Sequence, residues 1–246
     1  MLRRPAVSRL ERSQSARRHH QMTTPPEPSK GLVQRAPEVA GGVLRSILEF
    51  AIEGRGSIPG AKSAAARTLQ TRGEHEAAVD ALVRQHVSLA GAQGFLTNLG
   101  GLLTLPVALP ANLAGLAVVQ MRMIAAIVHL RGYDVDDRRV RVALTLAMLG
   151  EDEVRKQVAA SKLPGRPFLV ATAPVFDPAL DRQISERVFG DLGTKMAGKH
   201  AVVQVAKRIP LIGGGVGAAA DGYFTYALGQ YARREFVRRR RGSSND

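Results

Sequence analysis

The sequence has no cysteine and no tryptophan, and aromatic residues make up only 4% of its 246 residues. Without cysteine the chain can hold no disulfide scaffold, thiol nucleophile, iron–sulfur cluster or cysteine-ligated zinc. Hydrophobic residues still make up 45% and charged residues 23%, which is enough for one ordinary domain with a sizeable core. This apolar fraction excludes a collagen-like or wholly disordered chain.

Charged residues are missing from two long stretches of the chain. Gln85–Met121 runs for 37 residues without Asp, Glu, Lys or Arg, and residues 209–220 form the second stretch. Within the first, residues 102–120 have a mean hydropathy close to the threshold for membrane segments. One interpretation is therefore a re-entrant or spanning hairpin that turns near Gly100 and Pro106.

The other interpretation is a fully buried central helix of a helical bundle, entered through Pro110 in its first turn. We favour this helix, because polar residues point in different directions around it and would disrupt a lipid-facing surface. These residues are Asn112, Gln120, Arg122 and His129. Peripheral contact with a membrane is compatible with it, and an integral hairpin remains the alternative.

Most other segments have the apolar spacing of amphipathic helices. The expected helices cover residues 39–53, 61–70, 74–92, 136–149 and 180–199, and residues 201–205 are the one β candidate. The prediction is an all-α fold. It consists of a single helical bundle with a very apolar central helix pair and a glycine-rich turn before the C-terminal helix.

The net charge of +14 is concentrated at the two ends of the chain. We expect residues 1–30 to be a disordered basic segment, of which residues 1–21 look like an over-extended gene start. The helical domain is expected over residues 31–236, and residues 237–246 are expected to be a basic disordered tail. The N-terminal segment has no apolar core of a secretory signal. Together with the absent cysteines, this favours a cytoplasmic protein.

Consecutive arginines in the tail, Arg238, Arg239, Arg240 and Arg241, are candidates for membrane or anion contact. Near an anionic lipid surface each contributes about 1 kcal/mol of attraction. A solvated helix end that suits the helix macrodipole is the simpler interpretation. Nucleic acid is an unlikely partner, because no stacking aromatic residues lie among the arginines and no recognition motif accompanies them.

The motifs that resemble catalytic or cofactor sites are incomplete. Residues 193–200 match a phosphate-binding loop except that His200 stands at the Ser/Thr position that ligates magnesium. The glycines after Pro210 match a relaxed dinucleotide fingerprint, but no alternation of strands and helices follows them. We therefore expect no catalytic residues, no metal ligands and no cofactor. The glycine-rich segment is better interpreted as a tight turn into a close-packed helix, formed by Pro210, Gly213, Gly214, Gly215 and Gly217.

A polar group inside the apolar core is the most specific prediction. Arg122 lies in the most apolar segment, where an unpaired buried charge would cost several kcal/mol. We expect it to pair with Asp221, which follows the second charge-free stretch, or else with Asp134. Alternatively, Arg122 extends to a polar edge of the bundle. His129 and Gln120 complete this predicted polar core.

Several short motifs together resemble the EcsC-type family of bacterial proteins over roughly residues 74–236. The motifs are Gly94-Phe95, Gly100–Pro106, Pro110, Gln120–Arg122, Arg131–Asp134, and Pro210–Gly217 with Asp221. The resemblance implies a helical, often membrane-associated bacterial protein. The family takes its name from an ABC-transporter gene neighbourhood linked to secretion, and it supplies no catalytic residues to carry over.

The function expected from these observations is that of a non-enzymatic accessory protein at the cytoplasmic face of the bacterial membrane, linked to transport or secretion. Its expected partner is the membrane surface or a membrane protein such as an ABC transporter. The alternative is a soluble hydrolase with a site near Arg122, His129 and Asp221. A pocket that converges on those side chains would favour the hydrolase.

Overall fold

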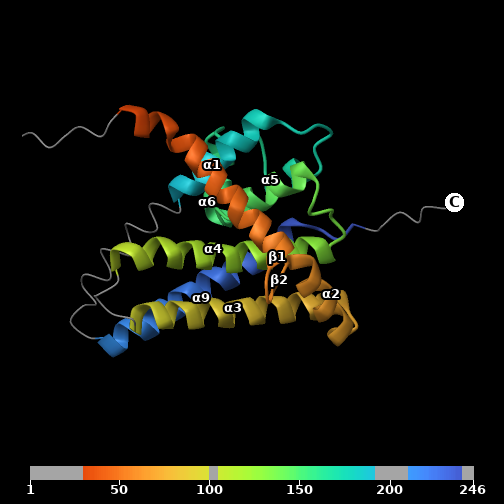
Figure 1. Cartoon of the computed structure of the whole chain (residues 1–246). Helices are drawn as coiled ribbons and strands as arrows, with labels where there is room; N and C mark the ends of the chain where they lie inside the picture. The colour runs from red at the N-terminus through yellow and green to blue at the C-terminus, as the bar shows by residue number, and fades with distance from the viewer. Residues whose placement is uncertain (1–29, 100–104, 192–209, 240–246) are drawn as a thin grey trace, which may run out of the picture. The chain divides into compact units, whose positions relative to one another are not determined.

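The computed structural model describes residues 30–99, 105–191 and 210–239. Residues 37–246 form one compact unit, and residues 1–36 form another, of which only the beginning of the first helix is described. Helices make up most of the described chain (Figure 1), which confirms the all-α prediction. Several predictions fall outside the described residues: the turn at Gly100, the strand at 201–205, the motif at 193–200, and the end segments 1–29 and 240–246.

Each helix expected outside the charge-free stretches overlaps one in the structure. In chain order the elements are α1 (Lys30–Glu53), β1 (Gly54–Arg55), β2 (Ile58–Pro59), α2 (Ala61–Arg72), α3 (His75–Leu99), α4 (Leu105–Leu130), α5 (Arg138–Ala147), α6 (Glu151–Ala159), α7 (Pro167–Ala171), a helix over residues 178–191, and α9 (Pro210–Glu235).

The short antiparallel ribbon of β1 and β2 was not expected. Gly54 (φ +76°) and Gly56 (φ +59°) adopt left-handed backbone conformations that reverse the chain between α1 and α2. A Cβ atom on Gly54 would lie 2.4 Å from the backbone nitrogen of Gly60. The two-residue strands are a consequence of this tight reversal and leave the fold class unchanged.

Three long helices, α3, α4 and α9, lie side by side (Figure 1). α3 runs antiparallel to α9, because Gly91 lies next to Ala218 whereas Val83 lies next to Gly229. A Cβ atom on Gly229 would approach the Val83 side chain to 2.9 Å. The missing side chain therefore allows the two helices to approach closely.

α4 runs antiparallel to α3 and parallel to α9. Gly115 leaves room for the side chain of Gln93 on α3. Farther along α4, the buried side chain of Gln120 donates a hydrogen bond of 3.2 Å to Thr225 Oγ1 on α9. These contacts make one bundle in which all three helices share a buried interior.

The second half of α4 is buried on all sides. From Gln120 to Leu130 every side chain is buried except Arg122 and His129, which are partly exposed. This half of the helix matches the buried-helix interpretation of the charge-free stretch. Among the described residues, no helix combines the length and hydropathy needed to cross a bilayer.

α4 begins at Leu105, five positions before the predicted entry at Pro110. Pro106 suits the first turn of a helix, where a backbone N–H has no partner within the helix. Pro110 lies one turn farther in, where it removes a single backbone hydrogen bond. The prediction placed the start too late because it took Pro110 as the residue of the first turn.

The glycine-rich segment also differs from its prediction. Pro210, Gly213, Gly214, Gly215 and Gly217 do not form a turn, because the backbone is helical from Pro210 onward and α9 includes all of them. Proline is pre-organised for the first helical position, and each interior glycine weakens a helix by only about 1 kcal/mol. The glycine-rich segment continues into the rest of α9, and the packing of this long helix on α3 and α4 offsets the cost of the glycines.

α5 packs beside α4 and against α7. Asp137 caps its N-terminus by accepting a hydrogen bond of 2.8 Å from the backbone N–H of Arg139. This agrees with the helix predicted over residues 136–149, because an aspartate is a favourable N-cap residue. Lys62 of α2 forms a 2.5 Å ion pair with Asp136, so α2 is also linked to this corner of the fold.

Candidate functional site

The two ends of the three-helix bundle differ in charge. α3 carries no charged residue after Arg84, α4 none before Arg122, and α9 none before Asp221. Because α3 runs antiparallel to the other two helices, Arg84 and Arg122 lie at nearly the same level, since the neighbouring Val83 and Met123 both lie against Gly229. Asp221 lies between one and two turns farther toward the charge-free end, because the adjacent Gly222 lies against Val87. The charge-free parts of all three helices therefore point to one end (Figure 1). A rise of about 1.5 Å per residue makes the charge-free part of α4 about 25 Å long.

Three exposed aromatic residues lie on α9 where its charge-free part ends. Tyr223, Phe224 and Tyr226 have exposed fractions of 68%, 54% and 50%. The rings of Tyr223 and Phe224 are in edge-to-face contact, with centroids 6.0 Å apart. The chain has only eleven aromatic residues, 4 tyrosines and 7 phenylalanines. Three exposed aromatic side chains on one helix, here called the aromatic patch, are therefore an unusual concentration.

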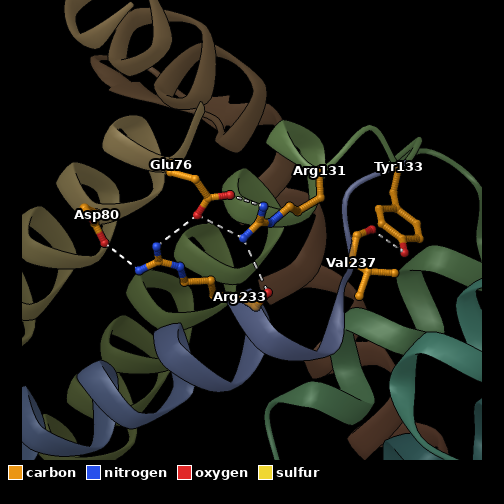
Figure 2. Close-up of polar contacts among 6 residues, drawn as sticks. All are labelled: Glu76, Asp80, Arg131, Tyr133, Arg233 and Val237. Carbon is orange, nitrogen blue, oxygen red and sulfur yellow. Dashed lines mark hydrogen bonds and ion pairs between the residues drawn. The ribbon is translucent and has the colours of Figure 1, made fainter. Parts of the chain in front are cut away.

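The opposite end of the bundle holds a cluster of ion pairs, formed by Glu76, Asp80, Arg131 and Arg233. Figure 2 shows Glu76 between the guanidinium groups of Arg131 and Arg233. Arg233 reaches Glu76 at 2.9 Å and Asp80 at 2.7 Å. These contacts connect the first turns of α3 to the turn after α4 and to the last turns of α9.

The electrostatics of this ion-pair cluster favour the ionised carboxylate. Burial acts to raise the pKa of Glu76, but hydrogen bonds and charges from Arg131 and Arg233 outweigh it and hold the pKa below its usual range. Only 9% of the Arg131 side chain is exposed, whereas 42% of the Glu76 side chain is exposed. The cluster is therefore partly buried, and we infer that it has a structural role.

The turn after α4 holds the residues that follow α9 through three consecutive residues, of which Figure 2 shows Arg131 and Tyr133. The Arg131 carbonyl oxygen accepts a hydrogen bond of 2.8 Å from the Arg239 backbone N–H. The Tyr133 hydroxyl donates a hydrogen bond of 3.0 Å to the Val237 carbonyl oxygen. Between them, Gly132 has φ +87°, and a Cβ atom there would lie 2.8 Å from the Arg239 carbonyl oxygen.

These contacts include residues that the sequence analysis assigned to the basic tail. Val237 and Arg239 lie against the folded domain, and the guanidinium of Arg239 lies 5.4 Å from the centre of the Tyr133 ring. Arg238 is exposed. Arg240 and Arg241, the other two arginines predicted to contact anions, lie outside the described residues.

The structure brings together only part of the predicted polar core. Gln120 has an internal partner in Thr225, but no ion pair of the described residues joins Arg122 to Asp221 or to Asp134. Asp134 is exposed and accepts a hydrogen bond from the backbone N–H of Asp136 at 3.0 Å. Asp221 is buried on α9.

Arg122 is partly exposed on α4. The pKa of its guanidinium is lowered by burial and by the nearby positive charge of Arg67 on α2. Its Nε atom is buried without a hydrogen-bond partner in the described part of the chain. Arg122 thus lies at the boundary of the charge-free end, and its charged neighbour there, Arg67, is also a cation. His129 is partly buried in the last turn of α4.

His86 is a buried polar residue that the sequence analysis missed. Its Nδ1 atom donates to the carbonyl oxygen of Leu82 at 2.8 Å, so Nε2 is the unprotonated nitrogen of the neutral ring. Burial lowers its pKa to about 4, and the charge of Arg122 contributes in the same direction. A single histidine inside an amphipathic pattern gave no signal of this environment.

Two well-formed pockets among the described residues lie away from the predicted hydrolase site. Neither is lined by Arg122, His129 or Asp221; both lie around α5 and the segment that follows α7. The described residues contain no group of histidine and carboxylate side chains arranged to hold a metal ion.

The ion-pair cluster and the aromatic patch were also missed by sequence reasoning. Glu76 and Asp80 belong to the ordinary polar face of a helix, and nothing local marks their partner Arg233. The aromatic patch did leave a signal, because Tyr223, Phe224 and Tyr226 lie close together in a chain with few aromatic residues.

Comparison with known proteins gives one match. No curated protein and no solved structure matches the chain. The model of the EcsC protein family matches residues 38–240, which include α2 to α9, the charge-free end and the ion-pair cluster. The Arg131–Asp134 motif, which carried the resemblance, contributes the turn that holds the C-terminal residues. The chain belongs to the EcsC protein family.

Proposed function

We propose that this protein is a non-enzymatic accessory protein, peripheral to the inner face of the cell membrane, whose charge-free bundle end contacts lipid. The observation that carries the proposal is the position of the aromatic patch. Tyr223, Phe224 and Tyr226 lie on α9 directly after Asp221, where the charge-free part of the helix gives way to the charged part.

The physical basis is the preference of tyrosine for membrane–water interfaces. Its ring packs among apolar groups while its hydroxyl stays in contact with water, so tyrosines gather at the level of the lipid head groups. In this orientation the charge-free parts of α3, α4 and α9 face the lipid. The ion-pair cluster at the other end faces the aqueous side, where its charges remain hydrated.

Arg122 fits the same orientation. It is the first charged residue of α4 and lies at the level of the aromatic patch, without an ion pair to any carboxylate of the described residues. A lipid phosphate is a suitable partner for such a guanidinium, because arginine binds phosphate through parallel hydrogen bonds. The predicted Arg122–Asp221 pair is replaced in this proposal by a contact to an anionic lipid head group.

The described part of the basic tail lies at the opposite end of the bundle from the aromatic patch. Val237 and Arg239 pack on Tyr133 at the ion-pair end of the bundle, so Arg238 also lies at that end. From Asp221 to Glu235 α9 rises by about 21 Å. A membrane that contacts the aromatic patch therefore lies well away from Arg238. We assign lipid contact to the charge-free end, and we propose that the tail contacts a membrane protein such as a transporter.

A single-tryptophan experiment tests the proposal directly. Because the chain contains no tryptophan, the variant Phe224→Trp reports only on the aromatic patch. We expect its fluorescence to shift to shorter wavelength and to increase when vesicles of phosphatidylglycerol and phosphatidylethanolamine are added. Val43→Trp on α1, where the native side chain is 41% exposed, is the matched control and should not shift.

Two results would contradict lipid contact by this end. The first is an unchanged Phe224→Trp spectrum at saturating vesicle concentration, and the second is an equal shift of the control. Fractionation of the native protein adds a second measurement. We expect it to stay with membranes through a high-salt wash, because apolar contact is insensitive to salt. Release by salt alone would assign binding to the arginines of the tail.

A further inference from the structure

A second site lies in the same compact unit, between α1, α5 and the helix over residues 178–191. Its pocket has a volume of about 240 Å³. Arg45 of α1 and Arg138 and Arg141 of α5 line it, together with the hydroxyl residues Thr145 and Ser185. A pocket lined by three arginines and two hydroxyl residues is suited to an anion.

The positive charge of this pocket is not balanced by its own walls. Asp181 is the only acidic residue in the lining, and none of the ion pairs among the described residues involves Arg45 or Arg138. Arg141 contacts Asp136 at 3.5 Å and Glu53 at 4.0 Å, and neither of these carboxylates lines the pocket. Burial raises the pKa of Asp181 even though Arg45 and Arg138 act to lower it. The pocket therefore carries an excess of positive charge.

An apolar pocket of about 320 Å³ adjoins the cationic one. Both share Val142 and Phe176 as wall residues. The guanidinium of Arg138 lies 4.0 Å from the centre of the Phe176 ring, so this arginine is held at the wall between the two pockets. The apolar pocket is lined largely by aliphatic side chains, and the one arginine in its lining, Arg139, is ion-paired with Asp137 at 2.5 Å.

Two of those aliphatic side chains are unusually exposed. Leu169 is 52% exposed and Val175 is 74% exposed. Single exposed aliphatic residues are common on protein surfaces, but here they flank an apolar hollow beside an unbalanced positive one. We propose that the two pockets together bind an amphipathic anion, with its phosphate at Arg45 and Arg138 and its apolar chain against Leu169 and Val175.

Charge complementarity selects this ligand over others. A neutral apolar molecule would leave Arg45 and Arg138 without an ion-pair partner, and a free inorganic anion would leave the apolar pocket unused. A phosphate with an attached acyl chain satisfies both pockets. The site is separate from the aromatic patch, and its ligand need not lie in a bilayer.

Isothermal titration calorimetry on the full chain tests the site with three probes. They are dioctanoyl phosphatidic acid below its micellar concentration, dioctanoyl phosphatidylcholine, and inorganic phosphate. We expect phosphatidic acid to bind with one molecule per chain. Phosphatidylcholine, which has the same chains but a bulky cation on its phosphate, and inorganic phosphate, which lacks the chains, should each bind more weakly by about tenfold or more.

Variants then locate the binding. The double variant Arg45→Gln/Arg138→Gln should weaken phosphatidic acid binding by about tenfold or more, through the loss of two charged contacts. Leu169→Asp should also weaken phosphatidic acid binding, because it places a charge in the apolar pocket. The Leu169 side chain is exposed, so this change is compatible with folding. Arg155→Gln, which removes an exposed arginine of α6 outside both pockets, is the matched control and should bind as the native chain does.

The aromatic-patch variant Tyr223→Ser/Phe224→Ser separates this proposal from the proposed function. It should keep phosphatidic acid binding in solution while it loses vesicle binding. The inference is overturned if none of the probes binds, or if phosphatidic acid binds the Arg45→Gln/Arg138→Gln variant as tightly as the native chain. Equal affinity for phosphatidylcholine or for inorganic phosphate would overturn it as well.

Discussion

Arg233 and Asp80 are 153 positions apart in the sequence, and their side chains form an ion pair of 2.7 Å. This contact fixes the last turns of α9 against the first turns of α3. It lies at the end of the bundle opposite the charge-free stretches, where Glu76 and Arg131 complete the ion-pair cluster. One end of the bundle is thus fixed by charges, whereas the described parts of the three helices at the other end carry none, so the two ends suit different surroundings.

Arg131 should make the largest contribution to stability within the ion-pair cluster. We expect Arg131→Ala to lower the free energy of unfolding by about 1.5 to 3 kcal/mol, because it removes a buried group that holds Glu76 and the end of α9. Urea denaturation measures the change. Arg155→Ala, whose side chain is 73% exposed in an ion pair with Asp152, should change it by less than about 0.5 kcal/mol. Equal effects of the two variants would refute a structural role for the cluster.

His86 should make stability depend on pH. Its pKa is about 4 in the folded protein and near 6.5 in an unfolded chain, so the unfolded state binds the extra proton between these values. The free energy of unfolding should therefore fall as the pH falls from about 6.5 to 4, by at most about 3 kcal/mol.

His86→Leu isolates this contribution. The variant should be less sensitive to pH over that interval than the native chain, when both are compared by urea denaturation at pH 7.5 and pH 4.5. Carboxylates that titrate at the acid end affect both proteins alike, so the difference between them reports on His86. An identical pH dependence of the two proteins would mean that the ring is not held neutral.

Gly229 should not tolerate a side chain. A Cβ atom there would lie 2.9 Å from Val83 and 3.2 Å from the Met123 sulfur, so Gly229→Ala should cost about 1 to 3 kcal/mol through overpacking. Gly42→Ala on α1 is the control, because nothing lies within 4 Å of a Cβ atom there. It should stabilise the chain by about 0.5 to 1 kcal/mol. Thermal unfolding measures both variants: the midpoint temperature should fall for Gly229→Ala and rise for Gly42→Ala.

The residues just after α9 should matter more for folding than their place near the chain end suggests. Phe236 is fully buried in edge-to-face contact with Tyr133, with ring centroids 5.5 Å apart. Phe236→Ala should lower the free energy of unfolding by about 3 to 5 kcal/mol. Val237→Ala, at a 55% exposed side chain, should have little effect, because the hydrogen bond at Val237 uses its backbone carbonyl. A small effect of Phe236→Ala would mean that this end is not part of the core.

The sequence by itself determined the class of the fold and much of its layout. Apolar residues at helical spacing predicted helices at 39–53, 61–70, 74–92 and 136–149, and the polar residues within the charge-free stretch pointed to a buried helix. These features depend on neighbours a few positions apart, so local periodicity and caps such as Asp137 are sufficient to predict them. The motifs of the EcsC family were visible in the same local patterns.

Only the tertiary structure decided which polar groups meet. Arg122 was matched to Asp221 because both follow charge-free stretches, yet the structure pairs Gln120 with Thr225 and leaves Arg122 beside a cationic neighbour. The segment after Pro210 read as a turn because glycine disfavours helices locally, but packing of α9 against α3 and α4 outweighs that preference. Ion pairs and pockets depend on side chains that are far apart in sequence and are brought together only by helix packing, which local propensity does not encode.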